Sequence, residues 1–242
     1  NFKIIKTKFT TILIIKILAK LSSLIPKFII INSKKAKNIY EISGYNKKKL
    51  ILIPNGYDLS ALKISDEIKN KFRKKYNINK KVLLIGNVAR FHPKKDHLNL
   101  LRALSLINAK RKNFFCILVG SEVNKQNKIL TSEIKKLNLK NRVKLLGQKN
   151  NILEIMNGLD IYVQSSSYGE GFPNVVAESM ACGTPCVATN VGDASIIIDK
   201  TGWIVQPENS LKLSEGIEEA LYEARTKQWK KKCNSARQRI KK

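Results

Sequence analysis

The residues best suited to hold a ligand lie in one loop, which reads Ser-Ser-Ser-Tyr-Gly-Glu-Gly-Phe-Pro-Asn over residues 165–174. Pro173 suits the first turn of a helix predicted over 173–182, and Gly183 suits the position just after its end. Free backbone amides at the start of a helix carry partial positive charge, which favours an anion such as phosphate. Because proline has no N–H, the expected donors are the amides of the neighbouring residues: Gly171, Phe172, Asn174 and Val175.

Two glutamates flank this predicted anion site. Glu178 lies about 7 Å along the helix from Pro173, which is far enough from the anion for its carboxylate to accept hydrogen bonds from a ribose diol. Glu170 lies in the loop itself, where it could accept a hydrogen bond from a sugar hydroxyl. The alternative is that Glu170 is a turn residue and Glu178 a solvated helix residue. Spacing alone does not choose between these interpretations.

A second cluster follows the strand predicted over 82–88. Arg90 and Lys95 leave the same strand end and can converge on a diphosphate, with Arg as a bidentate fork and Lys as a point charge. The alternative is a pair of solvated cations in a basic protein. Asp96 is expected to cap the next helix, and His97 is expected to be a structural residue of its first turn.

The elements that position these residues alternate regularly after about residue 64. Strands are predicted over 82–88, 114–119, 142–146, 160–164, 185–189 and 203–205, and helices over 96–109, 127–138, 152–158, 173–182 and 210–226. Short apolar strands alternating with helices indicate an α/β fold with a Rossmann-like, doubly wound parallel sheet. Ligands of such sheets bind at the carboxyl ends of the strands, where both clusters lie.

The preceding part of the chain has a different organisation. A helix is predicted over 8–25, a short strand over 28–33, a second helix over 35–43 and a second strand over 50–53. The turn-forming run Pro54-Asn55-Gly56 follows, and we place a domain boundary close to it. The tail, 227–242, is predicted to form a basic helix.

The chain carries a formal net charge of +28, from 46 Lys and Arg against 18 Asp and Glu. Such an excess favours anionic partners: nucleic acid, anionic lipid or phosphorylated small molecules. Most of it is Lys beside much Ile and Asn, which also fits a biased codon supply. With only 7% aromatic residues and no helix-turn-helix, zinc or RNA-binding signature, nucleic acid is not an expected partner.

The four cysteines are predicted to be reduced, structural thiols of a cytoplasmic protein. Cys182 and Cys186 are four positions apart, but neither His92 nor His97 lies at a familiar zinc-ligand spacing from them. The cysteines are Cys116, Cys182, Cys186 and Cys233.

No segment of the sequence is expected to span a membrane. The apolar stretch 9–31 is interrupted by lysines and by Pro26, whereas a spanning helix needs about 20 unbroken apolar residues. The helix predicted over 8–25 has a basic side and an apolar side, which fits peripheral attachment to anionic lipid at the inner face of the membrane as well as packing between domains. Because the chain begins with Asn1, we expect it to be part of a longer protein.

Together these motifs resemble the retaining glycosyltransferases of family four, which have the two-domain GT-B fold. Glu170 and Glu178 reproduce that family's paired glutamates, and the resemblance covers about 50–225. The matching pieces are Pro54-Asn55-Gly56 with Asp58, Arg90 with Lys95-Asp96-His97, Leu118-Val119-Gly120, Gly147, Glu170-Gly171-Phe172-Pro173 through Glu178, Met180 to Pro185, and Val191-Gly192. The chain departs from the pattern at Ala89, where Gly is common, and at Asn190, where Asp is common.

The resemblance implies transfer of a hexose-type unit from a nucleoside-diphosphate sugar, with a UDP-sugar expected, to an acceptor hydroxyl with retention of configuration. It implies that Arg90 and Lys95 neutralise the leaving diphosphate. It further implies that Glu170 holds the donor sugar and Glu178 the ribose. The expected catalytic residues are therefore Arg90, Lys95 and Glu170, and the expected donor-binding residues are Gly171, Phe172, Asn174, Val175 and Glu178.

The same resemblance implies the partners: a nucleotide-sugar donor and a lipid-linked or glycan acceptor in polysaccharide or glycolipid biosynthesis. No Asp-x-Asp motif occurs, so no metal and no cofactor is expected. Two alternatives stay open, a GT-B nucleotide-sugar epimerase and a donor-binding module without activity.

The implied domains are three. Residues 1–54 would end the amino-terminal acceptor domain, 55–226 would form the nucleotide-sugar-binding domain, and 227–242 the basic helix. In similar enzymes the amino-terminal domain carries the acceptor site and a catalytic His. The chain is therefore expected to bind the donor without turning it over.

Overall fold

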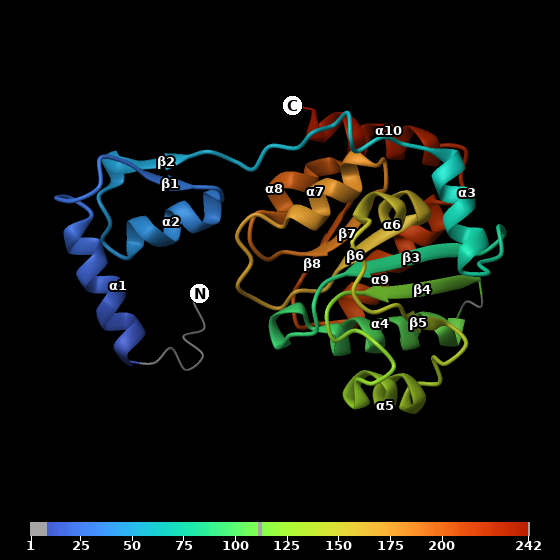
Figure 1. Ribbon diagram of the computed structural model, residues 1–242. Coiled ribbons are helices and arrows are strands. Elements are labelled where there is room, and N and C mark those ends of the chain that lie inside the picture. The colour runs from blue at the N-terminus through green and yellow to red at the C-terminus, as the bar shows by residue number, and fades with distance from the viewer. Residues whose placement is uncertain (1–8, 111–112, 242) are drawn as a thin grey trace. The chain divides into compact units, whose positions relative to one another are not determined.

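The computed structural model describes residues 9–110 and 113–241, and the chain divides into two compact units at Gly56 (Figure 1). Each unit has its own parallel sheet, two-stranded in the first unit and six-stranded in the second. The predicted candidate residues all fall in the second unit.

Over residues 9–56, the first unit consists of two helices, one short 3-10 turn and two strands. Its elements are α1 (Phe9–Leu21), β1 (Ile29–Ile31), α2 (Lys34–Ile42), η1 (Lys47–Lys49) and β2 (Leu50–Leu52). Helix α1 ends before the predicted residue 25 because Ser22 Oγ donates to the carbonyl oxygen of Ala19 at 2.5 Å, which competes with helix continuation. In the described ranges no helix has both the length and the apolar character needed to cross a membrane.

The second unit is built on a parallel sheet with the strand order β5-β4-β3-β6-β7-β8. The strands are β3 (Leu83–Val88), β4 (Phe114–Val119), β5 (Val143–Leu145), β6 (Ile161–Gln164), β7 (Cys186–Thr189) and β8 (Trp203–Val205). Every predicted strand is present, and the predicted doubly wound, Rossmann-like sheet is confirmed. Winding reverses between β3 and β6, which makes their carboxyl ends the topological switch point of the sheet.

Helices cover both faces of this sheet (Figure 1). They are α3 (Asp66–Lys75), α4 (His97–Lys110), α5 (Lys128–Lys136), α6 (Ile152–Gly158), α7 (Asn174–Ala181), α8 (Ala194–Ile198), α9 (Ser210–Glu223) and α10 (Trp229–Ile240), with the 3-10 turns η2 (Pro93–Lys95) and η3 (Asp199–Thr201). Helices α4, α5 and α9 pack on one face, around Ile85 and Val163. Helices α3, α6, α7, α8 and α10 pack on the other, around Leu84 and Tyr162.

Two of these helices were absent from the sequence prediction. Helix α3 is strongly polar, and its only apolar residues are Ile68 and Phe72, which are too few to predict a helix from apolar periodicity. Its capping pattern does indicate a helix, since Ser65 Oγ accepts from the Ile68 amide at 3.2 Å and Asp66 opens the first turn. Helix α8 has only five residues, too few to show a period.

All four cysteines are free thiols, which agrees with the sequence prediction. Cys116, Cys182 and Cys186 are buried, and Cys233 is partly buried. Burial raises the pKa of Cys233 to about 11 and that of Cys182 and Cys186 to about 12. These thiols are therefore protonated and unreactive at neutral pH.

Asp160, which immediately precedes β6, anchors the amino ends of the two central strands. Its carboxylate accepts from Arg73 at 2.6 Å, from Lys69 at 2.7 Å and from the Leu84 amide at 2.7 Å. Arg73 is 5% exposed and Asp160 9% exposed. Helix α3 is thereby fastened to β3 and β6 through one desolvated ion network.

His97, in the first turn of α4, is buried against the ring of Phe91, at 5.8 Å between centroids. Burial lowers the pKa of His97 to about 4; the Ala89 backbone opposes the shift, and the Lys95 charge adds to it. The imidazole is therefore neutral at pH 7. The predicted cap at Asp96 is present, since its Oδ1 accepts from the Asn99 amide at 3.2 Å.

The substitution Asp160→Asn should lower the free energy of unfolding by about 3–5 kcal/mol, because it leaves buried Arg73 without its counter-charge. Urea denaturation measures this. The matched control is Glu154→Gln, which removes an ion pair with Lys75, whose side chain is 55% exposed. That control should cost less than about 1 kcal/mol. An equally small loss for Asp160→Asn would contradict the role given to Asp160.

Stability should also fall as the pH falls from 6.5 toward 4, because the unfolded chain then binds a proton at His97 that the folded chain does not. Between pH 7 and pH 5 this contribution is about 2 kcal/mol. In His97→Gln this contribution to the pH dependence of the free energy of unfolding should be absent. Urea denaturation of both proteins at the two pH values provides the test, and parallel pH profiles would show that His97 does not contribute.

Candidate functional site

The candidate site lies at the carboxyl ends of β3 and β6. The segments that follow these strands, 89–97 and 165–178, carry both clusters singled out in the sequence. Gly120, after β4, packs against the loop after β3, since a Cβ there would lie 2.1 Å from the carbonyl oxygen of Ala89. Only glycine allows the loops after β3 and β4 to approach so closely.

Hydrogen bonds fasten the loop after β6 to the 3-10 turn η2. Ser165 Oγ donates to the carbonyl oxygen of Lys95 at 2.8 Å, and the Ser167 amide donates to that of Lys94 at 2.8 Å. A Cβ on Gly169, whose φ is +70°, would press on the Lys94 side chain. The two clusters, far apart in sequence, therefore form one rigid unit.

An ion pair joins the clusters at their centre. Lys95 Nζ lies 2.5 Å from Glu170 Oε1, and Ser166 Oγ donates to the same oxygen at 2.6 Å. The side chains are 29% exposed for Lys95 and 13% for Glu170. Lys95 was predicted to contact a diphosphate and Glu170 a sugar, but their contact with each other, and the part of Ser166, were not predicted.

Glu178 extends from α7 and is half-buried. Burial raises the pKa of Glu178 above its usual range. Burial raises the pKa of Tyr162 in β6, and its neighbours Cys186, Glu170 and Glu178 raise it further. Glu170 and Glu178 therefore lie within electrostatic reach of the same buried hydroxyl group.

The amino end of α7 faces this region. Pro173 precedes α7 in extended conformation instead of lying in its first turn, a one-residue correction to the prediction. Pro173, at the N-cap, makes no side-chain hydrogen bond to this helix end, and the Val176 amide donates to the Pro173 carbonyl oxygen at 3.1 Å. A Cβ on Gly192 would lie 2.4 Å from the carbonyl oxygen of Gly171, which also accepts from the Asp193 amide at 2.9 Å. The loop after β7 therefore packs against Gly171 and holds its backbone in place.

Arg90 is exposed at the end of β3. The backbone on either side of it is fixed, since the Ala89 amide donates to the Val119 carbonyl at 2.9 Å and the Phe91 amide to that of Ser121 at 2.8 Å. Around the start of α7, Phe172 and Val175 are partly buried and Asn174 is exposed. The predicted residues thus belong to two segments, one from the end of β3 through η2 and the other from the loop after β6 to Glu178 in α7.

One further residue at this place was not predicted as part of the site. Tyr57 donates its phenol hydrogen to Asn174 Oδ1 at 2.7 Å and stacks on Phe172, with 6.3 Å between ring centroids. The sequence shows Tyr57 only as a member of the turn run that begins at Pro54. Nothing in that run signals a contact with α7.

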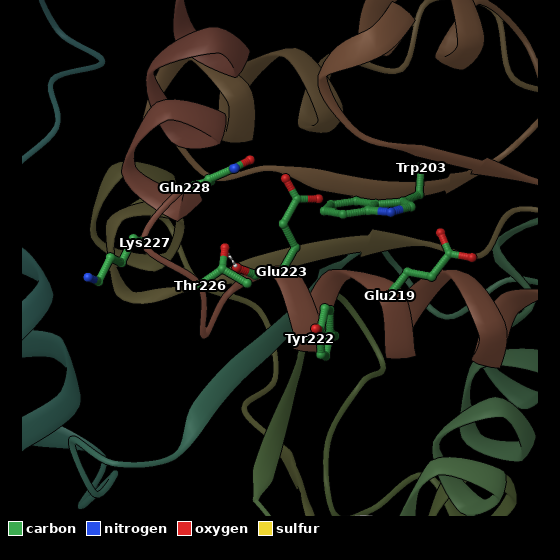
Figure 2. A pocket seen from close by; sticks show the side chains of 7 residues that line it. All are labelled: Trp203, Glu219, Tyr222, Glu223, Thr226, Lys227 and Gln228. Carbon is green, nitrogen blue, oxygen red and sulfur yellow. Dashed lines mark hydrogen bonds between the residues drawn. The ribbon is translucent and has the colours of Figure 1, made fainter.

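A separate hollow of about 500 Å³ lies beside the edge strand β8 (Figure 2). It is lined by Trp203, Glu219, Tyr222, Glu223, Thr226, Lys227 and Gln228. Trp203 begins β8 and Glu223 ends α9, so the hollow is at the amino ends of the strands. It is therefore distinct from the candidate site, which is at the carboxyl ends.

Comparisons with known proteins agree with the fold and with the motifs. The relatives include the uncharacterized glycosyltransferase MJ1059 of Methanocaldococcus jannaschii, 31% identical over 67% of this chain and 39% of that protein. They also include the N-acetylgalactosamine-N,N'-diacetylbacillosaminyl-diphospho-undecaprenol 4-alpha-N-acetylgalactosaminyltransferase of Campylobacter jejuni, 28% identical over 83% of this chain and 53% of that protein. The chain thus spans about half, or less, of the length of these relatives.

Among solved structures, HepE of Anabaena in complex with UDP matches with a TM-score of 0.87 and 25% identity, over 95% of this chain and 63% of that one. The family model described as "Glycosyl transferases group 1" matches residues 68–242, which include every predicted site residue. The chain therefore belongs to the group 1 glycosyl transferases, whose solved neighbours have the GT-B fold.

Proposed function

We propose that this chain is the donor-binding part of a glycosyltransferase that moves a sugar from a nucleoside-diphosphate sugar to an acceptor hydroxyl with retention of configuration. The observation that carries the proposal is the Lys95–Glu170 ion pair at the switch point of the sheet, beside the amino end of α7. A cation, helix amides and carboxylates at the carboxyl ends of neighbouring strands match the parts of a nucleotide-sugar: diphosphate, sugar and ribose. Family membership supports the same reaction class.

In this proposal Arg90 and Lys95 neutralise the negative charge that grows on the departing diphosphate. The amides of Gly171, Phe172, Asn174 and Val175 add fixed dipoles directed at the same charge. Groups held in place before the reaction need no reorganisation while the charge develops, which is the usual source of electrostatic catalysis. No metal is required in this scheme, and that remains a prediction.

Glu170 is proposed to hold the donor sugar and Glu178 the ribose. Lys95 and Ser166 both bind the Oε1 atom of Glu170, and an ionised carboxylate has about four acceptor sites. Glu170 can therefore keep both contacts and still accept from a sugar hydroxyl. Its partners orient the carboxylate before the sugar arrives.

The expected donor is a UDP-sugar, because the similar HepE was solved with UDP. The expected acceptor is lipid-linked, because the Campylobacter relative is named for a diphospho-undecaprenol substrate. We therefore propose a part in polysaccharide or glycolipid biosynthesis, in the cytoplasm at the inner face of the membrane. Residues 1–54 would belong to the acceptor-binding half.

The ion pair itself tests the proposal. Lys95→Met should weaken binding of UDP by about 10-fold or more, because it removes a cation and leaves the Glu170 carboxylate unpaired beside the diphosphate. Glu170→Gln should leave UDP affinity equal or higher, since it frees Lys95. The double variant should bind UDP more tightly than Lys95→Met alone. Titration calorimetry measures all three.

The control for these variants is Lys212→Met with Glu215→Gln, which removes an exposed ion pair on α9. It should not change UDP affinity. Strictly additive effects of the Lys95 and Glu170 substitutions would show that the pair does not face the diphosphate. Unchanged affinity in Lys95→Met would remove the basis of the proposed function.

A further inference from the structure

We propose that Tyr57 forms one side of the donor site. It positions the start of α7, covers Glu178 and packs against the nucleoside part of the donor. The inference rests on the proposed function and adds to it a residue outside the two clusters. Tyr57 begins the second unit, so all the contacts that carry the inference lie within that unit.

The contacts of Tyr57 fall on residues of the candidate site. Its hydroxyl donates to Asn174 Oδ1 at 2.7 Å, and Asn174 is the first residue of α7. Its ring lies over that of Phe172 with an angle of 27° between the planes. Tyr57 thus touches the residue on each side of Pro173, at the helix end that would receive the diphosphate.

Tyr57 also lies close to Glu178, because Asn174, its hydrogen-bond partner, is four residues before Glu178 and on the same face of α7. Burial raises the pKa of Tyr57, and the negative charge of Glu178 raises it further. The titratable groups that interact with Glu178 in the described ranges come from three elements: Tyr57 from the segment before α3, Tyr162 from β6 and Cys182 at the end of α7. Of these, Tyr162 and Cys182 are buried, whereas Tyr57 is only partly so. Tyr57 is therefore the accessible member of the group.

The backbone after Tyr57 is held firmly, so its position is built into the fold. Asp58 Oδ1 accepts from the Ser60 amide at 2.9 Å and from Ser60 Oγ at 2.6 Å, which fixes a tight turn. The Arg237 guanidinium of α10 donates to the Leu62 carbonyl at 2.6 Å. A tyrosine anchored in this way loses little conformational freedom when a ligand binds.

The chemistry of Tyr57 fits the nucleoside. A phenol offers a flat apolar face together with one hydrogen-bonding group. If Glu178 accepts from the ribose diol, the adjoining ring can cover the ribose and exclude water from the carboxylate. Exclusion of water strengthens the hydrogen bonds that Glu178 accepts.

Calorimetric titration of the 242-residue chain with UDP tests the inference. Tyr57→Phe keeps the ring and loses only the hydrogen bond to Asn174, so it should bind UDP about 3- to 10-fold more weakly. Tyr57→Ala loses the ring as well and should bind at least about 10-fold more weakly than Tyr57→Phe. The matched control is Tyr222→Ala on α9, whose side chain is 66% exposed; its affinity should stay within about twofold of the wild type.

The pH dependence of binding separates a site residue from a merely structural one. UDP binding should weaken on the acid side as Glu178 takes up a proton, and burial places that step above the usual pKa of a glutamate. Tyr57→Ala exposes Glu178, so the step should move to lower pH. Tyr57→Phe keeps the ring and should leave the step where it is. A weaker affinity with an unmoved step in Tyr57→Ala would overturn the covering role.

Glu178→Gln distinguishes failure of this inference from failure of the proposed function. If Glu178→Gln weakens UDP binding and both Tyr57 variants bind like the wild type, the role of Tyr57 is overturned and the donor site stands. If Glu178→Gln also binds like the wild type, the proposed function fails together with the inference. The same double failure follows if the wild type binds none of UDP, GDP and ADP.

Discussion

The ion pair between Lys95 and Glu170 is the contact on which the site depends. The two residues are 75 positions apart and belong to loops that leave different strands. They meet only because the sheet order places β6 directly beside β3, although β4 and β5 lie between them in sequence. Ser165, Ser166 and Ser167 add the hydrogen bonds that hold the loops together. Catalytic and binding groups in parallel α/β sheets gain their precision from such rigid strand ends.

The same two strands are fastened at both ends by polar groups with different exposure. At the amino ends, Asp160 is almost fully buried and is bonded to Arg73, Lys69 and the Leu84 amide. At the carboxyl ends, Lys95 keeps a partly exposed ammonium group. A fully satisfied buried network rigidifies the fold, whereas a partly exposed ion pair remains able to exchange a partner for a ligand. In the proposed function, stability and donor binding therefore depend on opposite ends of the same two strands.

Much of the fold could be predicted from local sequence, because each strand of the second unit is a short apolar run between turn signals. Helix α3 was not predicted because most of its residues are charged or polar and Phe72 is its only buried aromatic residue. The site was predictable where one segment carries its own chemistry, as with Gly171 to Glu178. Contacts between distant segments were not predictable. Tyr57 and Asn174, for example, are 117 positions apart, and neither residue type indicates a contact with the other.

The most direct test of this account is a crystal structure of the chain with UDP bound. The account predicts diphosphate oxygens within hydrogen-bonding distance of Lys95 Nζ and of the first amides of α7, with the ribose hydroxyls on the Glu178 carboxylate. UDP bound in the hollow beside Trp203, or anywhere that leaves the Lys95–Glu170 pair remote from phosphate, would contradict it.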